Sequence, residues 1–387
     1  MRRRVVIAGG GTGGHVFPGL AVADALRALA DVEVVFVGSP RGLESRIVPA
    51  HGYTLEVLDV GPMKGGGAAR AVRGGATAAR ATFAARRLLA RVEPDVVLGV
   101  GGYAAGPVCL AAALRGIPVA VLEPNAAPGL TNRILGPFSR RAYVAWAEAE
   151  GSFRAGRTRA LGVPIRAGFA AADYVCHAPP RVLVLGGSQG AQALNERVPG
   201  ALAMCKMHAS VLHQTGDAQR AAVEDAYRGR GVEGVRVVSF IDDVARELAA
   251  ADLVVSRAGA VTVAEICAVG RPAVLIPFPF AADDHQARNA RAVAVAQGAV
   301  CILQDDATAG RLAREIGGLL DDPQRRARMA AAARGLGRPA AARAVAEDLL
   351  DLGMIRPMTR RAGVNGAPGA HGDGVMNRSL FLGPEGT

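Results

Sequence analysis

Aromatic residues and lysine are scarce in this chain. Only 4% of its residues are Phe, Trp or Tyr, and lysine occurs only at Lys64 and Lys206. Few aromatic side chains leave few platforms on which unpaired bases can stack, and no known nucleic-acid-binding motif is present. The composition therefore argues against a nucleic-acid-binding protein, an alternative that only the formal net charge of +11 suggests.

Cysteine is also sparse, and the few cysteines are scattered without a CxxC pair. They are Cys109, Cys176, Cys205, Cys267 and Cys301. This spacing argues against a disulfide scaffold and against a zinc ribbon. His285 follows Asp283 and Asp284, so it is either a metal ligand or a solvated turn residue, but no second histidine stands at ligand spacing. We therefore expect no metal site, and we expect no cofactor.

No apolar run is both long and unbroken enough to span a bilayer. Residues 96–114 carry no charge, but Gly101-Gly102 and Gly106-Pro107 interrupt them. This pattern predicts a buried strand, a glycine-rich turn and a helix. The apolar residues near the start stop at Gly9, so the start predicts a first β-strand rather than a signal peptide.

The chain has 387 residues, 50% of them hydrophobic, and short Val/Ile/Leu runs alternate with Ala-rich helical stretches. Strands are expected at 5–8, 32–37, 56–60, 96–100, 119–122 and 142–145, and again at 182–185, 211–213, 235–238, 253–256, 273–276 and 300–303. Continuously apolar strands are typical of parallel sheets covered on both faces. The sequence therefore predicts an α/β fold with two Rossmann-like, doubly wound domains.

The domain limits follow from where the strand pattern restarts. We expect one domain at 1–162, a second at 163–339, a C-terminal helix within 340–356 and a disordered Gly/Pro-rich tail at 357–387. The helix could close either domain.

Each predicted domain opens with a glycine-rich turn after its first strand. Gly9-x-Gly11-x-x-Gly14 matches the dinucleotide fingerprint, and residues 186–190 form the second turn. Such turns bring backbone N–H groups close to a diphosphate. A ribose-binding acid is missing at the end of the second strand, which reads Val37-Gly38-Ser39. The pattern favours a diphosphate ligand and counts against NAD.

His15 directly follows the first glycine loop. It either fills the first turn of a helix or serves as a general base at the carboxyl edge of the sheet. A helix N-terminus disfavours the imidazolium form, so it would keep His15 neutral and able to accept a proton.

Two polar segments follow strands in the second half. Thr262-x-x-Glu265 fits a capping box, but Glu265 could also accept both hydroxyls of a ribose if it faces the ligand. The run from Asp283 to Asn289 carries imidazole and amide groups that suit sugar hydroxyls.

A basic, partly apolar stretch precedes residue 92. It contains Arg70, Arg73, Arg80, Arg86, Arg87 and Arg91 with Val72, Phe83, Leu88 and Leu89. It is either a surface that docks on an anionic membrane or an ordinary solvated helix face with Phe83 in the core.

Eight motifs occur in an order that resembles one family. They are GGGTGGHVFPGLAVADAL, GGYAAGP, EPNAAPGLTNR, LGGSQGAQALN, HQTG, SFIDD, SRAGAVTVAE and PFPFAADDHQARNA. Together they resemble the MurG family, the undecaprenyl-diphospho-muramoylpentapeptide β-N-acetylglucosaminyltransferases of peptidoglycan synthesis. The resemblance runs from about residue 5 to about residue 352.

The resemblance implies a GT-B fold, with two domains facing across a cleft. It implies metal-independent, inverting transfer of N-acetylglucosamine from UDP-N-acetylglucosamine to the C4 hydroxyl of the lipid-linked muramoyl pentapeptide. The first domain would take the acceptor and the second the donor. The implied setting is peripheral, on the cytoplasmic face of the bacterial cell membrane, with cell-wall synthesis proteins as further partners and no nucleic acid.

The resemblance also implies the site residues. His15 matches the base, and Thr12, Gly13 and Gly14 match the loop near the acceptor diphosphate and donor sugar. Asn125 and Gln286 match contacts to the sugar, Arg166 and Ser188 donor contacts, and Ile241 a backbone contact to uracil. The segment that holds the diphosphate and the ribose is matched by Ala260, Val261, Thr262, Val263, Ala264 and Glu265.

Two stretches depart from the family. Leu122-Glu123-Pro124-Asn125 replaces a His-Glu-Gln-Asn run, so a backbone donor is lost at Pro124. Residues 61–67 replace a basic stretch expected near the acceptor. Two other GT-B activities stay open as alternatives, a UDP-N-acetylglucosamine 2-epimerase and a natural-product glycosyltransferase. An epimerase would need no lipid acceptor and no basic apolar surface.

Overall fold

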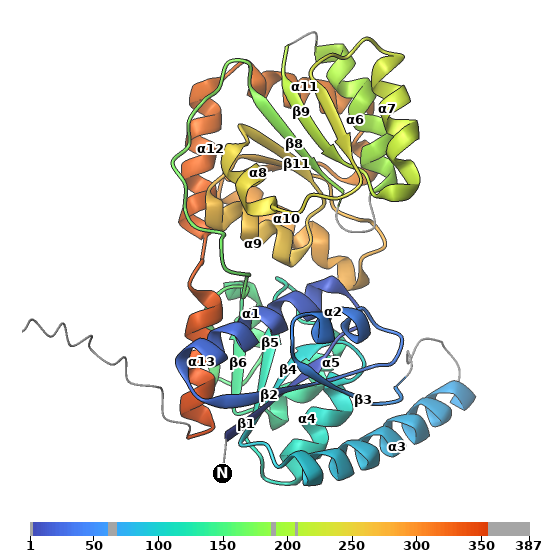
Figure 1. Ribbon diagram of the computed structural model, residues 1–387, viewed down its shortest axis with the longest axis vertical. Coiled ribbons are helices and arrows are strands. Elements are labelled where there is room, and N and C mark those ends of the chain that lie inside the picture. Colours follow the sequence, from blue (N-terminus) through green and yellow to red (C-terminus); the bar gives the residue numbers. More distant parts are fainter. Residues whose placement is uncertain (1–2, 61–67, 187–190, 206–207, 355–387) are drawn as a thin grey trace, which may run out of the picture. The chain divides into compact units, whose positions relative to one another are not determined.

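Two parallel β-sheets with packed helices make up the described part of the chain (Figure 1). The structure is a computed structural model that describes residues 3–60, 68–186, 191–205 and 208–354, and it describes only the backbone of residues 68–76. The first sheet has seven strands and the second has six. The predicted α/β class with two doubly wound halves is confirmed.

The first sheet has the strand order β3-β2-β1-β4-β5-β6-β7, and all its pairings are parallel. Its strands are β1 (Arg3–Gly9), β2 (Val32–Gly38), β3 (Thr54–Val57), β4 (Val96–Gly101), β5 (Val119–Glu123), β6 (Arg141–Val144) and β7 (Thr158–Ala160). The strand order reverses at β1: the chain adds β2 and β3 on one side of β1 and then β4 to β7 on its other side. Because ligands of such sheets bind where the strand order reverses, the carboxyl ends of β1 and β4 mark the expected site.

Helices cover both faces of this sheet. They are α1 (Gly13–Leu29), α2 (Glu44–Ala50), α3 (Ala68–Val92), α4 (Ala105–Leu114), α5 (Leu130–Leu135) and α13 (Ala341–Leu352). Alternate strand residues enter two separate cores: Val5 and Ile7 pack with α1 and α13, whereas Val6 and Ala8 pack with α3 and α4. Both faces are thus apolar, which explains the unbroken hydrophobic runs.

The second sheet has the order β10-β9-β8-β11-β12-β13 and reverses at β8. Its strands are β8 (Arg181–Leu185), β9 (Ser210–Gln214), β10 (Val235–Val238), β11 (Leu253–Ser256), β12 (Ala273–Leu275) and β13 (Ala299–Cys301). Its helices are α6 (Gln192–Cys205), α7 (Arg220–Arg228), α8 (Val244–Ala250), α9 (Ala260–Val269), α10 (His285–Val295), α11 (Ala309–Leu320) and α12 (Pro323–Leu336). Val182 and Val184 face one core, and Leu183 and Leu185 face the other.

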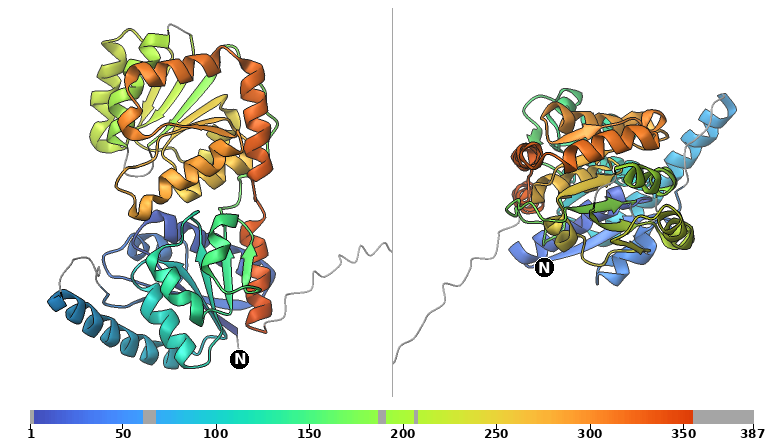
Figure 2. Two further views of the ribbon diagram at one scale, coloured as in Figure 1. Left: turned by 180° about the vertical axis from the view of Figure 1, so that it is seen from behind. Right: turned by 90° about the horizontal axis from the view of Figure 1, so that it is seen from above.

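The last helix, α13, packs on the first sheet, as Figure 2 shows from behind. Val345 and Leu349 join the core that contains α1. Asp348 accepts a hydrogen bond from the Tyr143 hydroxyl at 2.8 Å and pairs with Arg141 at 3.1 Å. The sequence left open which half this helix closes, and these contacts assign it to the first.

Each predicted strand is present at least in part, with three differences. A strand was expected at 300–303, but β13 covers Ala299–Cys301, and Ile302 is buried beyond its end. Residues 56–60 were expected to form the third strand, but β3 covers Thr54–Val57, and Leu58 and Val60 are buried beyond its end. The short, mostly exposed edge strand β7 was not predicted, because three residues without an apolar run leave no signal.

Residues 161–180 connect the two sheets, and their later part is fastened to the second. Arg271 is fully buried and donates to the carbonyl oxygens of Ala172 and Asp173. The His177 N–H donates to the buried carboxylate of Asp252 at 2.9 Å. The domain limits at 162/163 and 339/340 stay predictions. The predicted tail at 357–387 lies outside the described residues.

Within the part of the chain that the structure describes, no helix combines the length and the apolarity needed to cross a membrane. Residues 96–114, which carry no charge, form β4, a glycine turn and α4, as predicted.

Candidate active site

The predicted site residues gather at the carboxyl ends of strands in both sheets. Residues 10–15 follow β1, and Asn125 follows β5. In the second sheet, residues 260–265 form the start of α9 after β11, and Gln286 follows β12 at the start of α10. These are the edges at which parallel α/β sheets bind ligands.

Two glycine-rich turns of the first sheet lie backbone to backbone. The Gly10 N–H donates to the Gly101 carbonyl at 3.2 Å. Gly102 has a φ of +82°, and a Cβ built there would lie 2.2 Å from the Gly10 carbonyl oxygen. A side chain at this position would push the loops apart. The GGYAAGP motif thus shapes the first glycine loop.

His15 lies in the first turn of α1, after the N-cap residue Thr12. Its Nδ1 is 3.1 Å from the Gly10 carbonyl oxygen and 3.4 Å from Thr12 Oγ1. A carbonyl oxygen only accepts, so Nδ1 carries the proton and Nε2 keeps its lone pair. Burial lowers the pKa of His15, which keeps the imidazole neutral near pH 7. The arrangement can therefore accept a proton at Nε2.

Glu123 organises the loop that carries Asn125. Its buried carboxylate accepts hydrogen bonds from the Asn125 N–H at 3.0 Å, the Asn125 side-chain amide at 3.1 Å and the Gly129 N–H at 2.9 Å. The Asn132 side-chain amide donates to the same carboxylate at 2.9 Å. Asn125 is therefore fixed from within its own loop, although Pro124 supplies no N–H.

Asn289 on α10 links the loops of the two sheets. Its side chain is fully buried, and its Oδ1 accepts from the Ala126 N–H at 3.0 Å. Its amide donates to Asn125 Oδ1 at 3.2 Å and to the Ala258 carbonyl at 3.3 Å. One side chain thus brings the predicted sugar contact Asn125 next to the turn that starts α9.

Glu265 does not cap α9, because the N-cap residue is Gly259 and no side chain caps this helix end. The capping-box interpretation is therefore wrong. Glu265 lies in the second turn, is only 6% exposed, and its Oε1 is 3.3 Å from Arg166 Nη2. Burial raises the pKa of Glu265 to about 7, and Arg166 opposes that shift.

Arg166 connects this carboxylate with the helix that carries His15. Its guanidinium carbon lies 5.4 Å from the ring centre of Phe17 on α1 and 5.5 Å from that of Phe169. Both rings can hold the planar cation while it reaches Glu265. Two predicted donor contacts, Arg166 and Glu265, are therefore adjacent.

The start of α9 can hold an anion. Ala260, Val261 and Thr262 occupy its first turn, in which backbone N–H groups lack helical partners. Val263 and Ala264 continue the helix, and the Val263 N–H already donates to the Gly259 carbonyl at 2.9 Å. Gln286 braces the turn before the helix, since its Oε1 accepts from the Ala258 N–H at 3.3 Å and the Phe278 N–H at 3.0 Å.

Two residues predicted to contact the ligand, Ile241 and Ser188, take no part in the contacts described above. Ile241 is buried after β10, in the same core as Ile165 and Ala258. Ser188 lies outside the described residues, as does Lys64 in the altered 61–67 stretch. His285 is half-buried, and its Nδ1 lies 2.6 Å from the Ala282 carbonyl oxygen. The described residues contain no group of three or more His, Cys, Asp or Glu placed to hold a metal ion.

Three buried residues in this region, Glu44, Glu123 and Asn289, were not predicted to act in the site. Glu123 and Asn289 stand inside motifs, but their roles depend on partners contributed by other segments. Glu44 lies outside all eight motifs, and its carboxylate bonds to the first glycine loop. Glu44 is the first residue of α2, but its carboxylate bonds to Ser39 directly after β2, where a ribose-binding acid would be expected. It is only 2% exposed.

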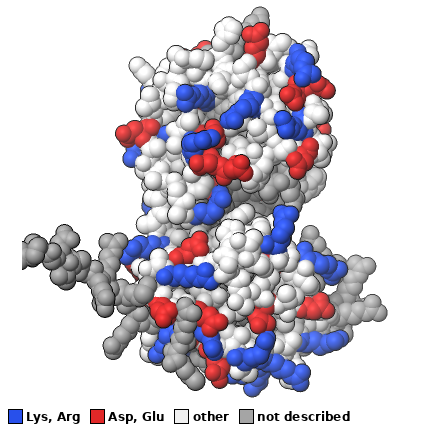
Figure 3. Space-filling model, viewed as in Figure 1, with Lys and Arg blue, Asp and Glu red and all other residues white. Residues whose placement is uncertain are grey.

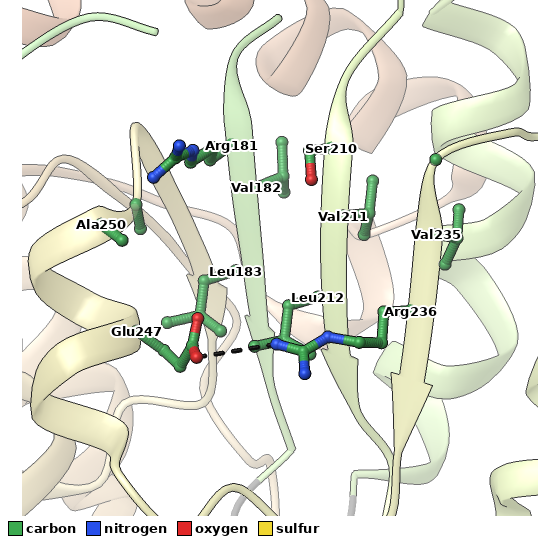
Figure 4. A pocket seen from close by; sticks show the side chains of 12 residues that line it. Arg181, Val182, Leu183, Ser210, Val211, Leu212, Val235, Arg236, Glu247 and Ala250 are labelled. Atoms are coloured by element: carbon green, nitrogen blue, oxygen red, sulfur yellow. Dashed lines mark ion pairs between the residues drawn. The ribbon is translucent and has the colours of Figure 1, made fainter.

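A separate groove of about 470 Å³ lies over β8, β9 and β10 (Figure 4). Arg181, Ser210 and Val235 line it, and each is the first residue of its strand. Arg236 and Glu247 form an ion pair of 3.6 Å within it. The groove therefore lies at the amino ends of the strands and contains none of the predicted site residues.

Comparison with known proteins identifies the relationship. Residues 5–144 match the glycosyltransferase family 28 N-terminal domain, and residues 181–347 match the glycosyltransferase family 28 C-terminal domain. Two curated relatives are named UDP-N-acetylglucosamine–N-acetylmuramyl-(pentapeptide) pyrophosphoryl-undecaprenol N-acetylglucosamine transferase. The one from Sorangium cellulosum is 53% identical, covering 90% of this chain and 88% of the relative. The one from Anaeromyxobacter sp. is 48% identical, covering 90% of this chain and 93% of the relative.

A solved structure agrees with these relatives. The crystal structure of MurG from Acinetobacter baumannii superposes with a TM-score of 0.77 at 33% identity, covering 90% of this chain and 99% of that one. The predicted resemblance to the MurG family and the predicted GT-B fold are thereby confirmed. The chain belongs to glycosyltransferase family 28.

Proposed function

We propose that this chain transfers N-acetylglucosamine from UDP-N-acetylglucosamine to the C4 hydroxyl of undecaprenyl-diphospho-N-acetylmuramoyl pentapeptide, with inversion at the anomeric carbon. The named relatives, at 48% and 53% identity over nine-tenths of the chain, support this function. The structural observation that carries it is the contact of His15 Nδ1 with the Gly10 carbonyl oxygen at 3.1 Å, which leaves Nε2 to accept a proton.

The reaction is one displacement. His15 Nε2 takes the proton of the acceptor hydroxyl while that oxygen bonds to the anomeric carbon. The bond from this carbon to the diphosphate oxygen breaks, and UDP leaves with the electron pair. The first-turn N–H groups of α9 are placed to stabilise the charge that UDP gains, so we propose that the transfer needs no metal ion.

The contacts around the site support a proposed position for each ligand group. Glu265 is placed to accept the ribose hydroxyls, and Arg166 holds that carboxylate in position. Asn125 and Gln286 present side-chain amides, which suit the donating and accepting hydroxyls of a sugar. We place the acceptor diphosphate at Gly13 and Gly14, the first residues of α1.

A product assay distinguishes this function from the other GT-B activities. With lipid-linked muramoyl pentapeptide and labelled UDP-N-acetylglucosamine, we expect the label in the lipid fraction as a disaccharide, with one UDP released per sugar. Without the lipid we expect no UDP-N-acetylmannosamine, the product that a 2-epimerase would form. Lipid-independent epimer formation, or DNA binding without UDP-sugar binding, would contradict the proposal.

The lipid acceptor requires contact with a membrane, and α3 offers a surface for it. Phe83 is 58% exposed and is not part of the core, so the core interpretation of this residue is wrong. Arg87 lies over its ring, 4.5 Å from the centre. Arg80, three residues earlier, is exposed on the same side of the helix. Figure 3 shows basic side chains gathered at the lower edge of its view, where α3 lies in Figure 1.

Of the other residues predicted for this surface, Arg86 and Arg91 are exposed, whereas the two leucines lie in the core. Leu88 and Leu89 are buried against the first sheet, and the side chains of Arg70, Val72 and Arg73 lie outside the described residues. We therefore define the docking surface as Arg80, Phe83 and Arg87, and we propose that it holds the enzyme peripherally on the cytoplasmic face of the cell membrane.

Replacing Arg80 and Arg87 with glutamine is expected to weaken binding to vesicles that contain anionic lipid. Each basic residue near an anionic surface contributes about 1 kcal/mol, so the pair should cost roughly 30-fold in affinity. Co-sedimentation with phosphatidylglycerol vesicles measures the effect. Arg228→Gln with Arg246→Gln, on helices of the second sheet, is the matched control. Equal binding by both double variants would contradict the assignment.

A further inference from the structure

Glu44 is a carboxylate buried at the carboxyl edge of the first sheet. One oxygen, Oε1, accepts hydrogen bonds from the Ser39 N–H and the Ser39 hydroxyl, both at 2.8 Å. The other, Oε2, accepts from the Gly11 N–H at 2.6 Å. Burial favours the protonated acid, but the hydrogen bonds from Gly11 and Ser39 outweigh it and lower the pKa of Glu44. The group is therefore an anion enclosed by the first glycine loop.

Three glycines leave the space that this carboxylate occupies: one in the first glycine loop, one at the end of β2 and one just before α2. A Cβ built at Gly10, Gly38 or Gly42 would lie 2.2, 2.4 or 2.1 Å from an atom of the Glu44 side chain. Real side chains do not approach this closely, so any of the three substitutions would displace Glu44. The glycine loop is thus built around an internal anion.

The Gly11 N–H that binds Glu44 and the Gly10 carbonyl that binds His15 belong to the same peptide group. The two groups point to opposite sides of a trans peptide. Glu44 Oε2 is 2.6 Å from the nitrogen of this peptide, and His15 Nδ1 is 3.1 Å from its oxygen. A peptide that donates to an anion becomes a stronger acceptor at its oxygen, because linked hydrogen bonds polarise one another.

We propose that Glu44 is a positioning residue for the base His15 and acts through the Gly10–Gly11 peptide. This inference rests on the proposed role of His15. The carboxylate fixes the peptide, the peptide oxygen holds the proton on Nδ1, and Nε2 is left as the stronger base. Glu44 does for His15, through one peptide, what a carboxylate bonded directly to a catalytic histidine does in hydrolases.

The same contact restricts where the acceptor can bind. Because the Gly11 N–H is already bonded to Glu44, it cannot also serve a diphosphate. The N–H groups of Gly13 and Gly14, at the start of α1, then remain for the acceptor. The loop resembles a dinucleotide fingerprint in sequence but uses its middle glycine for an internal anion.

Other charged groups also affect the pKa of His15, and a test of Glu44 must leave these groups unchanged. Glu123 at the end of β5 favours the imidazolium, as Glu44 does, whereas His285 at the start of α10 opposes it. Glu44→Gln removes one of these charges and leaves Glu123 and His285 unchanged. Glu33→Gln is the matched control, since Glu33 lies near the other end of β2 and pairs with Arg4 at 2.9 Å.

We expect Glu44→Gln to lower kcat about 10- to 100-fold, part of the 10²–10⁴-fold that a general base supplies, with little change in KM for UDP-N-acetylglucosamine. Loss of the anion should lower the pKa of His15, so the acidic limb of the pH–rate profile should move to lower pH. Nitrogen-15 NMR of the histidine ring measures this pKa directly. Glu33→Gln should match the wild type in all three measurements.

Ser39→Ala distinguishes the proposed action of Glu44 from simple bracing of the loop. It removes one hydrogen bond to Glu44 and keeps the charge, so kcat and the His15 pKa should stay near wild type. If Glu44 only braces the loop, Ser39→Ala and Glu44→Gln will lower Tm and kcat together and leave the His15 pKa unchanged, which would overturn the proposal. If the Glu44→Gln protein does not fold, the nitrogen-15 NMR spectrum of the wild-type histidine ring still tests the proposal. A proton on His15 Nε2 instead of Nδ1 would overturn it.

The failure of this inference can be told apart from a failure of the base assignment. If His15→Ala is impaired and Glu44→Gln is fully active, only the role of Glu44 is wrong. If His15→Ala keeps its turnover, the base assignment is wrong. In the His15→Ala background, Glu44→Gln should cause no further loss, because its effect depends on the imidazole.

Discussion

Replacing His15 with alanine is expected to lower kcat by about 10²–10⁴-fold, the contribution of a general base. The acceptor hydroxyl then has no group to take its proton as it attacks the anomeric carbon. Binding of UDP-N-acetylglucosamine should change little, because the donor contacts Arg166 and Glu265 belong to another part of the site. Initial rates at saturating donor and acceptor give kcat, and calorimetry with the donor gives the affinity for UDP-N-acetylglucosamine.

His51→Ala is the matched control for this variant. His51 is exposed at the end of α2, where its Nδ1 bonds to the Ile47 carbonyl at 2.9 Å. It should keep full activity. A His15→Ala protein with a folded circular dichroism spectrum and nearly normal turnover would remove His15 from the mechanism.

Glu265→Gln is expected to weaken the binding of UDP-N-acetylglucosamine about 10- to 150-fold. Hydrogen bonds to a charged group contribute about 1.5–3 kcal/mol, and the ribose hydroxyls would lose such an acceptor. Because burial raises the pKa of Glu265 to about 7, donor affinity of the wild type should also rise with pH through that value. In the variant, this pH dependence should disappear.

The stability of the folded protein should change with pH in the opposite direction to donor affinity. The folded-state pKa of Glu265 lies above its usual value, so the folded protein binds more protons than the unfolded one between about pH 4.5 and 7. The contribution of Glu265 to stability is therefore lost as pH rises through this window. Glu265→Gln should therefore not lower Tm at pH 8. For the measurement of donor affinity, the control variant is Glu247→Gln on α8, which should bind the donor as the wild type does. A Glu265 variant that binds the donor normally and only loses thermal stability would contradict the ribose assignment.

Much of the fold could be predicted because the strands are continuously apolar. Val5 to Ala8 alternate between two cores, so all four positions are hydrophobic and the run is easy to recognise. Strand β7 escaped prediction because Thr158 and Arg159 lie at a sheet edge, where burial does not demand apolar residues. The packing of α13 on the first sheet depends on Asp348 meeting Tyr143, a contact between residues 205 positions apart.

The position of a candidate site residue in the fold could be predicted where a motif joins a turn to a helix, as at His15 and Glu265. It was not predictable where function depends on contacts between distant segments. Glu44 reaches Gly11 across 33 positions, and Asn289 reaches Ala126 across 163. Such contacts leave no periodic pattern along the chain. The capping-box interpretation of Thr262 and Glu265 was wrong because the N-cap position is taken by Gly259, three residues before Thr262.

Transfer measured in the presence of excess chelator tests the central chemical claim most directly. Backbone N–H groups at the start of α9, rather than a cation, are proposed to stabilise the departing UDP. With EDTA present, labelled N-acetylglucosamine should still pass to the lipid-linked muramoyl pentapeptide at an unchanged rate, with equal release of UDP. Loss of transfer with EDTA, restored only by Mg²⁺ or Mn²⁺, would contradict the account.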